Sequence, residues 1–178
     1  MICVLAVVTA LLHITPTVVL VKRPDAVAAV LPDARTFLAR EIHLSDADAH
    51  RLHETVDWSP EEGVLTFYTG RDGDEVAGAL TFVRVDSPHG PVEVAVGFEP
   101  RGAIRKVVVT KATVETKPWV LEAVRAGLTT AYEGLTIGAT PDGAGTVRSA
   151  VGKMPVYMAE RVDMGVARAL AAYGAFYH

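Results

Sequence analysis

The chain has 178 residues, half of them hydrophobic, which is enough for one globular domain and one additional element. Its formal net charge is −4 at pH 7, so the composition does not favour nucleic acid as a partner. One cysteine and six histidines exclude a disulfide framework and a multi-cysteine zinc or iron–sulfur site.

The first 21 residues contain no charged side chain. A helix of about 20 apolar residues crosses the hydrocarbon core of a bilayer, and the segment lacks the basic start and the cleavage site of a signal peptide. We therefore expect a transmembrane anchor over residues 1–21 in contact with the lipid bilayer, a linker or short helix over 22–31, and one domain over 32–178. Lys22 and Arg23, taken alone, would place the domain in the cytoplasm.

His13 lies inside this apolar segment. An ionisable group at membrane depth can be a ligand to a haem or chlorophyll metal. A neutral imidazole bonded to a neighbouring helix is the alternative, and we favour it.

An extended segment over residues 34–44 precedes a helix that Ser45 caps and that spans Asp46 to Val56. His50 and His53 share a face of this helix and could bind a metal, but no carboxylate–histidine pattern surrounds them. A solvated helix face is the favoured interpretation.

Alternating apolar residues predict two hairpins, and together they predict a four-stranded antiparallel meander. An Asp-Gly turn joins the first pair of strands and a Pro-Arg-Gly turn joins the second. The expected strands are Val64–Tyr68, Glu75–Val85, Val92–Phe98 and Ile104–Lys111.

Two helices are expected after the meander, an amphipathic one over Pro118–Thr130 and a last one over about Tyr157–Tyr173. Between them lies a glycine-rich loop, 137–145, in which Pro141-Asp142-Gly143 argues against a helix start. We expect the aromatic tail to contact a partner or the membrane interface. The tail contains Tyr173, Phe176, Tyr177 and His178.

The order of these elements resembles the FMN-binding domain of membrane electron-transfer proteins, such as the G and C subunits of the Rnf and sodium-pumping NADH:quinone oxidoreductase complexes. The matching stretches are LPDARTFL, LSDADAHRL, VLTFYTGRDGDEVAGALTFV, GAIRKVVVTKATVET and AYEGL. The resemblance implies an α+β fold: one N-terminal transmembrane helix, then an antiparallel sheet flanked by helices. It also implies a cytoplasmic-membrane protein whose soluble domain lies on the periplasmic side. In the family, a threonine in a Ser-Gly-Ala-Thr motif carries FMN through a phosphoester.

The chain departs from that motif. The motif should fall within residues 149–157, where Gly152 fits but Met154 stands in place of the flavin-bearing threonine. A thioether cannot form a phosphoester. Thr140, in Gly138-Ala139-Thr140, is the alternative attachment residue.

The resemblance implies five cofactor-binding candidates and indicates no catalytic residue and no metal ligand. Glu115 and Thr116 match a loop that approaches the flavin in the family, although they also suit a polar turn that ends a strand. The candidates are Glu115, Thr116, Gly138, Thr140 and Lys153.

Two functions follow from this pattern. The favoured one is a flavin-free accessory or structural subunit that packs against other subunits of a bacterial membrane electron-transfer complex, either respiratory or a photosynthetic reaction-centre–antenna assembly. The alternative is an FMN-carrying electron-transfer protein, in which the flavin supplies the redox chemistry.

Overall fold

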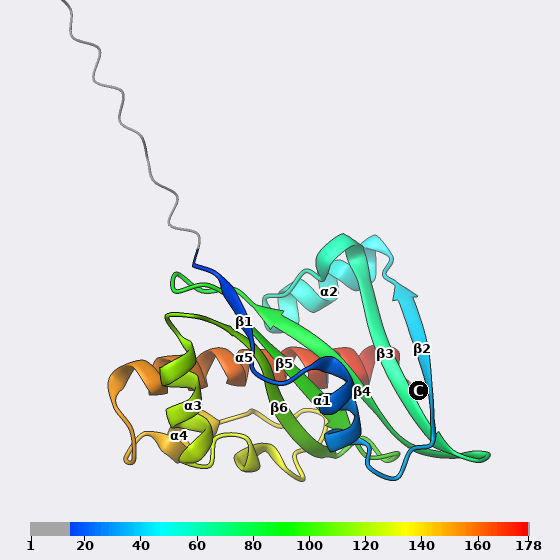
Figure 1. The fold of residues 1–178 in the computed structure, drawn as a ribbon. Helices are drawn as coiled ribbons and strands as arrows, with labels where there is room; N and C mark the ends of the chain where they lie inside the picture. The colour runs from blue at the N-terminus through cyan, green and yellow to red at the C-terminus, as the bar shows by residue number, and fades with distance from the viewer. Residues whose placement is uncertain (1–14, 178) are drawn as a thin grey trace, which may run out of the picture.

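The structure, a computed structural model, describes residues 15–177. It is an α+β fold in which helices cover a six-stranded antiparallel sheet with strand order β1-β6-β5-β4-β3-β2 (Figure 1). The strands are β1 Thr17–Val19, β2 Thr36–His43, β3 Val64–Asp72, β4 Glu75–Val85, β5 Val92–Phe98 and β6 Ile104–Thr113. The helices are α1 Arg23–Val30, α2 Asp46–Val56, α3 Lys117–Arg125, α4 Gly143–Val147 and α5 Lys153–Phe176, with short 3-10 turns η1 Glu61–Gly63 and η2 Thr130–Tyr132.

The central meander is confirmed, because β3 to β6 follow one another in the sheet as they do in the chain. The extended segment before Ser45 is β2, which adds an edge strand beside β3. Helix α2 begins and ends as expected, and the Ser45 hydroxyl accepts a hydrogen bond from the Asp48 amide at 3.2 Å.

Strand β5 is buried along its whole length because helices cover both faces of the sheet. Val94 packs against α5, where a Cβ added to Gly165 would lie 2.8 Å from the Val94 side chain. On the other face, a Cβ added to Gly97 would lie 1.7 Å from Val30 of α1. Glycine is therefore needed at residue 97 for α1 to approach the sheet (Figure 1).

The predicted anchor is wrong at its C-terminal end. Thr17–Val19 forms β1, which pairs antiparallel with β6, and the Leu20 amide donates to the Thr110 carbonyl at 2.8 Å. The β-branched Thr-Val-Val run suits a strand, and the open edge of β6 provides its partner. Among residues 15–177, no helix is both long enough and apolar enough to cross a bilayer. Residues 1–14, with His13, lie outside the described residues.

Residues 22–31 contain α1, which packs into the sheet and is part of the domain. The helix expected over Pro118–Thr130 is α3, which already ends at Arg125. The last helix, α5, begins at Lys153, one turn before the expected start at about Tyr157. Two rings of the aromatic tail pack within the domain, and its contact with a partner or the membrane interface stays a prediction. Tyr173 stacks on Phe98 at 4.2 Å between ring centroids, and Tyr177 lies 4.9 Å from Phe67.

Candidate functional site

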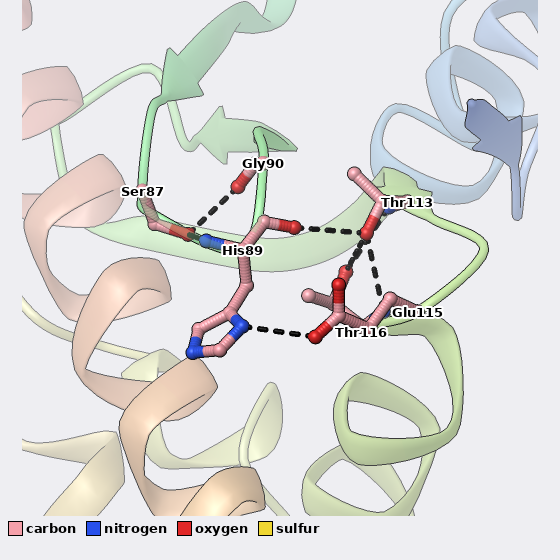
Figure 2. Close-up of polar contacts among 6 residues, drawn as sticks. All are labelled: Ser87, His89, Gly90, Thr113, Glu115 and Thr116. Atoms are coloured by element: carbon pink, nitrogen blue, oxygen red, sulfur yellow. Dashed lines mark hydrogen bonds and ion pairs between the residues drawn. The ribbon is translucent and has the colours of Figure 1, made fainter. Parts of the chain in front are cut away.

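The Glu115–Thr116 loop follows β6 and is closed by reciprocal threonine hydrogen bonds (Figure 2). The Thr116 hydroxyl accepts from the Thr113 amide at 3.0 Å, and the Thr113 hydroxyl accepts from the Thr116 amide at 3.1 Å. Thr116 is fully buried, and the Thr113 hydroxyl also donates to the His89 carbonyl at 3.1 Å. The Thr116 hydroxyl is therefore committed to the turn and does not face a cleft.

Glu115 pairs with a histidine of this chain. Its Oε1 lies 3.0 Å from Nδ1 of His89, which stands on the turn between β4 and β5 (Figure 2). The imidazole meets the rings of Trp119 and Tyr157 edge to face, at 5.4 Å and 5.6 Å between centroids. Side chains of α3 and α5, Trp119 and Tyr157, therefore surround the His89 ring with which Glu115 pairs.

Tyr157 connects this cluster to the start of α5. Lys153, one helical turn earlier, is exposed, and Met154 beside it is half-buried. A shallow hollow of about 290 Å³ lies here, and Arg148, which pairs with Glu160 at 3.6 Å, is on its wall. Three predicted cofactor residues, Glu115, Thr116 and Lys153, therefore lie at one end of the molecule.

The other two predicted residues lie elsewhere. Ile137, next to Gly138, packs against Gly174, whose added Cβ would lie 2.7 Å from the Ile137 side chain. At 1.5 Å per residue, α5 places Gly174 about 30 Å from Lys153. Thr140 is exposed on the same loop, between that contact and α4. The structure therefore does not bring the five predicted residues into one site.

Helix α4 corrects the expectation that no helix starts after Pro141. Asp142 is its N-cap and accepts from the Gly145 amide at 2.9 Å. The next backbone donors meet a carboxylate from within the chain: the amides of Gly143 and Ala144 donate to Asp163 of α5 at 2.7 Å and 3.1 Å. The position that a phosphate would take at this helix start is occupied by Asp163.

Tyr132 completes the Asp163 cluster by donating its hydroxyl to Oδ1 at 2.8 Å. Burial raises the pKa of Tyr132 far above its ordinary value, and the negative charge of Asp163 raises it further. The ring fits because residue 143 is glycine: an added Cβ would lie 2.3 Å from the Tyr132 hydroxyl oxygen. The Tyr132 hydroxyl and the two amides thus all donate to Asp163 and form a closed set of hydrogen bonds.

The histidines of α2 interact with their own helix. His50 lies 3.3 Å from Glu54, and His53 lies 3.6 Å from Asp57, all on the surface. Within the described residues, no group of three or more metal-binding side chains occurs.

Sequence reasoning missed His89, Tyr157 and Asp163. His89 lies between two predicted strands and Glu115 follows the next one, and in an antiparallel meander these two positions fall at the same end of the sheet. Asp163 interrupts the apolar pattern of α5 beside buried Val162, and a carboxylate in such a place requires partners.

No protein-family model matches the chain, and no curated protein matches it.

Proposed function

We propose that this protein is a flavin-free accessory subunit of a bacterial membrane electron-transfer complex. The resemblance to FMN-binding domains motivates the class of complex. One observation carries the flavin-free part: several groups that would hold a flavin are bound within the chain, and Met154 cannot form the phosphoester.

That observation has three parts. The Thr116 hydroxyl is buried in the turn, and Glu115 is paired with His89. Met154 stands in the first turn of α5, where the family has threonine, and a thioether forms no phosphoester. Asp163 takes the amides at the start of α4, so these donors are not available to a phosphate.

A second candidate, an FMN-carrying protein, has one observation in its favour. The hollow beside Lys153 joins a cationic side chain to the start of a long helix, a combination that suits a phosphate. Its volume, about 290 Å³, lies at the lower limit of small-molecule sites, which span about 300–1,000 Å³. The flavin ring system would need room that His89, Trp119 and Tyr157 fill.

Membrane attachment belongs to the same proposal: the apolar segment ahead of β1 anchors the domain at the cytoplasmic membrane, with the domain on the periplasmic side. A chain that begins at Thr15 is the matched variant. We expect the full chain in the membrane fraction and the shortened chain, which lacks the apolar segment, in the soluble fraction of the cytoplasm. Equal partition of both chains would contradict the anchor.

The experiment that tests the accessory role is native electrophoresis of the full chain from gently solubilised membranes of its own organism. We expect migration within an assembly far above 18.9 kDa, together with subunits whose spectra show haem, flavin or chlorophyll. Migration as an isolated 18.9 kDa protein that releases flavin on denaturation would favour the second candidate instead.

A further inference from the structure

We propose that the hollow on the α1 face of the sheet binds a small organic anion, a carboxylate carried on a flat apolar group. The hollow has a volume of about 780 Å³, well within the range of small-molecule sites. It is separate from the Glu115–His89 pair, which packs against α5.

One wall of the hollow is built around a buried carboxylate. The Glu93 side chain on β5 is 10% exposed, and its Oε2 accepts from Arg23 of α1 and from Lys111 of β6, both at 3.0 Å. Its Oε1 accepts from the Thr110 hydroxyl at 2.9 Å. Burial by itself raises the pKa of Glu93, but the bonds from Arg23, Lys111 and Thr110 outweigh burial and hold the pKa below its ordinary value.

On this wall, the two cations have more unused hydrogen-bond donors than Glu93 has unused acceptor sites. A carboxylate has about four lone-pair sites, and Glu93 uses three of them. A guanidinium has five N–H donors and an ammonium three. In the described part of the chain, Arg23 and Lys111 each use one donor, on the same oxygen of Glu93. The unused groups are donors on cations, so the ligand atom that this wall recognises is an anionic acceptor.

Two further arginines line the hollow, and each has a hydrogen-bonding partner in the domain. Arg84 lies 2.9 Å from Asp86, and Arg168 donates to the Asp57 carbonyl at 2.6 Å. Glu61, on η1, also lines the hollow. Arg23 and Lys111, by contrast, share a single carboxylate, Glu93, and this local excess of positive charge determines where the anionic group of a ligand lies.

The floor beside this wall is aromatic. Arg23 lies over the ring of Phe82 at 4.6 Å, and Tyr68 meets Phe82 edge to face at 5.8 Å. Both rings are half-buried, which leaves apolar surface open to the hollow. An apolar group next to the ligand's carboxylate would cover this surface, and a flat one can stack on these rings or meet them edge to face.

The test is a titration of the full chain, labelled with ¹⁵N, with 2-naphthoate, followed by amide chemical shifts. We expect saturable shifts at Phe82, Glu93 and Thr110, and none at Tyr157. The neutral analogue 2-naphthalenemethanol should bind at least about tenfold more weakly, because a hydrogen bond between charged groups contributes that much. Equal binding of the two compounds would overturn the proposal.

Two matched variants on β6 locate the site. Lys111→Gln should weaken naphthoate binding about tenfold or more, whereas Lys106→Gln, the same charge change on the exposed part of the strand, should change it less than about twofold. Arg23→Gln, at a half-exposed position on α1, replaces Lys111→Gln if that variant fails to fold. Unchanged affinity in these wall variants, or no saturation up to about 10 mM naphthoate, would contradict the site.

Discussion

Two helix starts in this protein present backbone amides in different ways. At α4, the amides of Gly143 and Ala144 are bound by Asp163, and Tyr132 closes the set from the side. At α5, Gly152 is the N-cap with no side-chain cap, and Lys153 is exposed beside a shallow hollow. An intramolecular carboxylate closes the first start, whereas the second is open to solvent but has methionine where a phosphoester would need a hydroxyl.

Under the proposed flavin-free function, the difference shows how such a fold can retain its helices and sheet without a cofactor. A buried helix start must have an acceptor, and a carboxylate from the chain serves as well as a phosphate. An exposed helix start is satisfied by water and needs no replacement. Each of the following predictions tests one side of this contrast.

The largest effect is expected at Asp163. Asp163→Ala leaves the Tyr132 hydroxyl and two amides without their acceptor in a buried setting, and each unsatisfied donor costs about 1–3 kcal/mol. We expect the free energy of unfolding to fall by about 3–5 kcal/mol in a urea titration. Glu160→Ala, one turn away on α5 with only a 3.6 Å surface pair, should cost less than about 1 kcal/mol. Equal losses in the two variants would contradict the closed set at α4.

Each helix start has a glycine, Gly143 at α4 and Gly152 at α5, and substituting them gives a smaller but more direct contrast. Gly143→Ala places a Cβ 2.3 Å from the Tyr132 hydroxyl oxygen and 2.7 Å from Leu128, so we expect a loss of about 1–3 kcal/mol from overpacking. Gly152→Ala meets nothing closer than Pro155 at 3.9 Å and should change the free energy of unfolding by less than about 0.5 kcal/mol. Thermal unfolding of both variants measures the difference, and a reversed order would contradict the packing described at the two helix starts.

Tyr132 adds a pH dependence. Its pKa is raised in the folded protein, so the neutral form is favoured there. Its contribution to stability is full below the unfolded pKa of about 10 and decreases as the pH rises above 10, where the unfolded chain releases the proton. Tyr132→Phe should lower stability by about 1 kcal/mol at pH 7 and flatten the decline between about pH 10 and 11. An unchanged slope would show that another group, such as Tyr173, dominates that range.

Much of the fold follows from local pattern. The alternation in Val92–Phe98, the Asp-Gly turn before Glu75 and the cap at Ser45 each predict the element that is observed. The N-terminal strand was missed because an apolar run fits a helix and a strand equally well, and its pairing partner, β6, lies far along the chain.

The candidate site was less predictable for a related reason. Pro141-Asp142-Gly143 suits a turn, and only Asp163, which is distant in sequence, turns it into a helix start. Likewise, nothing local pairs Glu115 with His89 or separates Gly138 from Lys153 by the length of α5. The pair depends on the register of β5 against β6, and the separation depends on the length of α5; no short motif encodes either.

A null effect is expected at the open helix start. Met154→Thr restores the hydroxyl, but Lys153 and Pro155 still interrupt the family motif, and His89, Trp119 and Tyr157 still fill the adjacent space. We expect no covalent flavin in this variant when it is expressed with the flavin-transfer machinery, as judged by intact mass. A mass increase equal to one FMN would show that the methionine alone keeps the flavin out.

The most direct test of the central claim uses the native protein isolated from its own membranes. One sample is run on a denaturing gel and viewed under ultraviolet light, which detects covalent flavin. A second sample is precipitated with acid, and its supernatant is assayed for released flavin. The account predicts a dark band at 18.9 kDa and no stoichiometric flavin in the supernatant. A fluorescent band, with the flavin located on Thr140 or another threonine by peptide mapping, would contradict it. Stoichiometric FMN released by acid would contradict it as well, because it would show a non-covalently bound flavin.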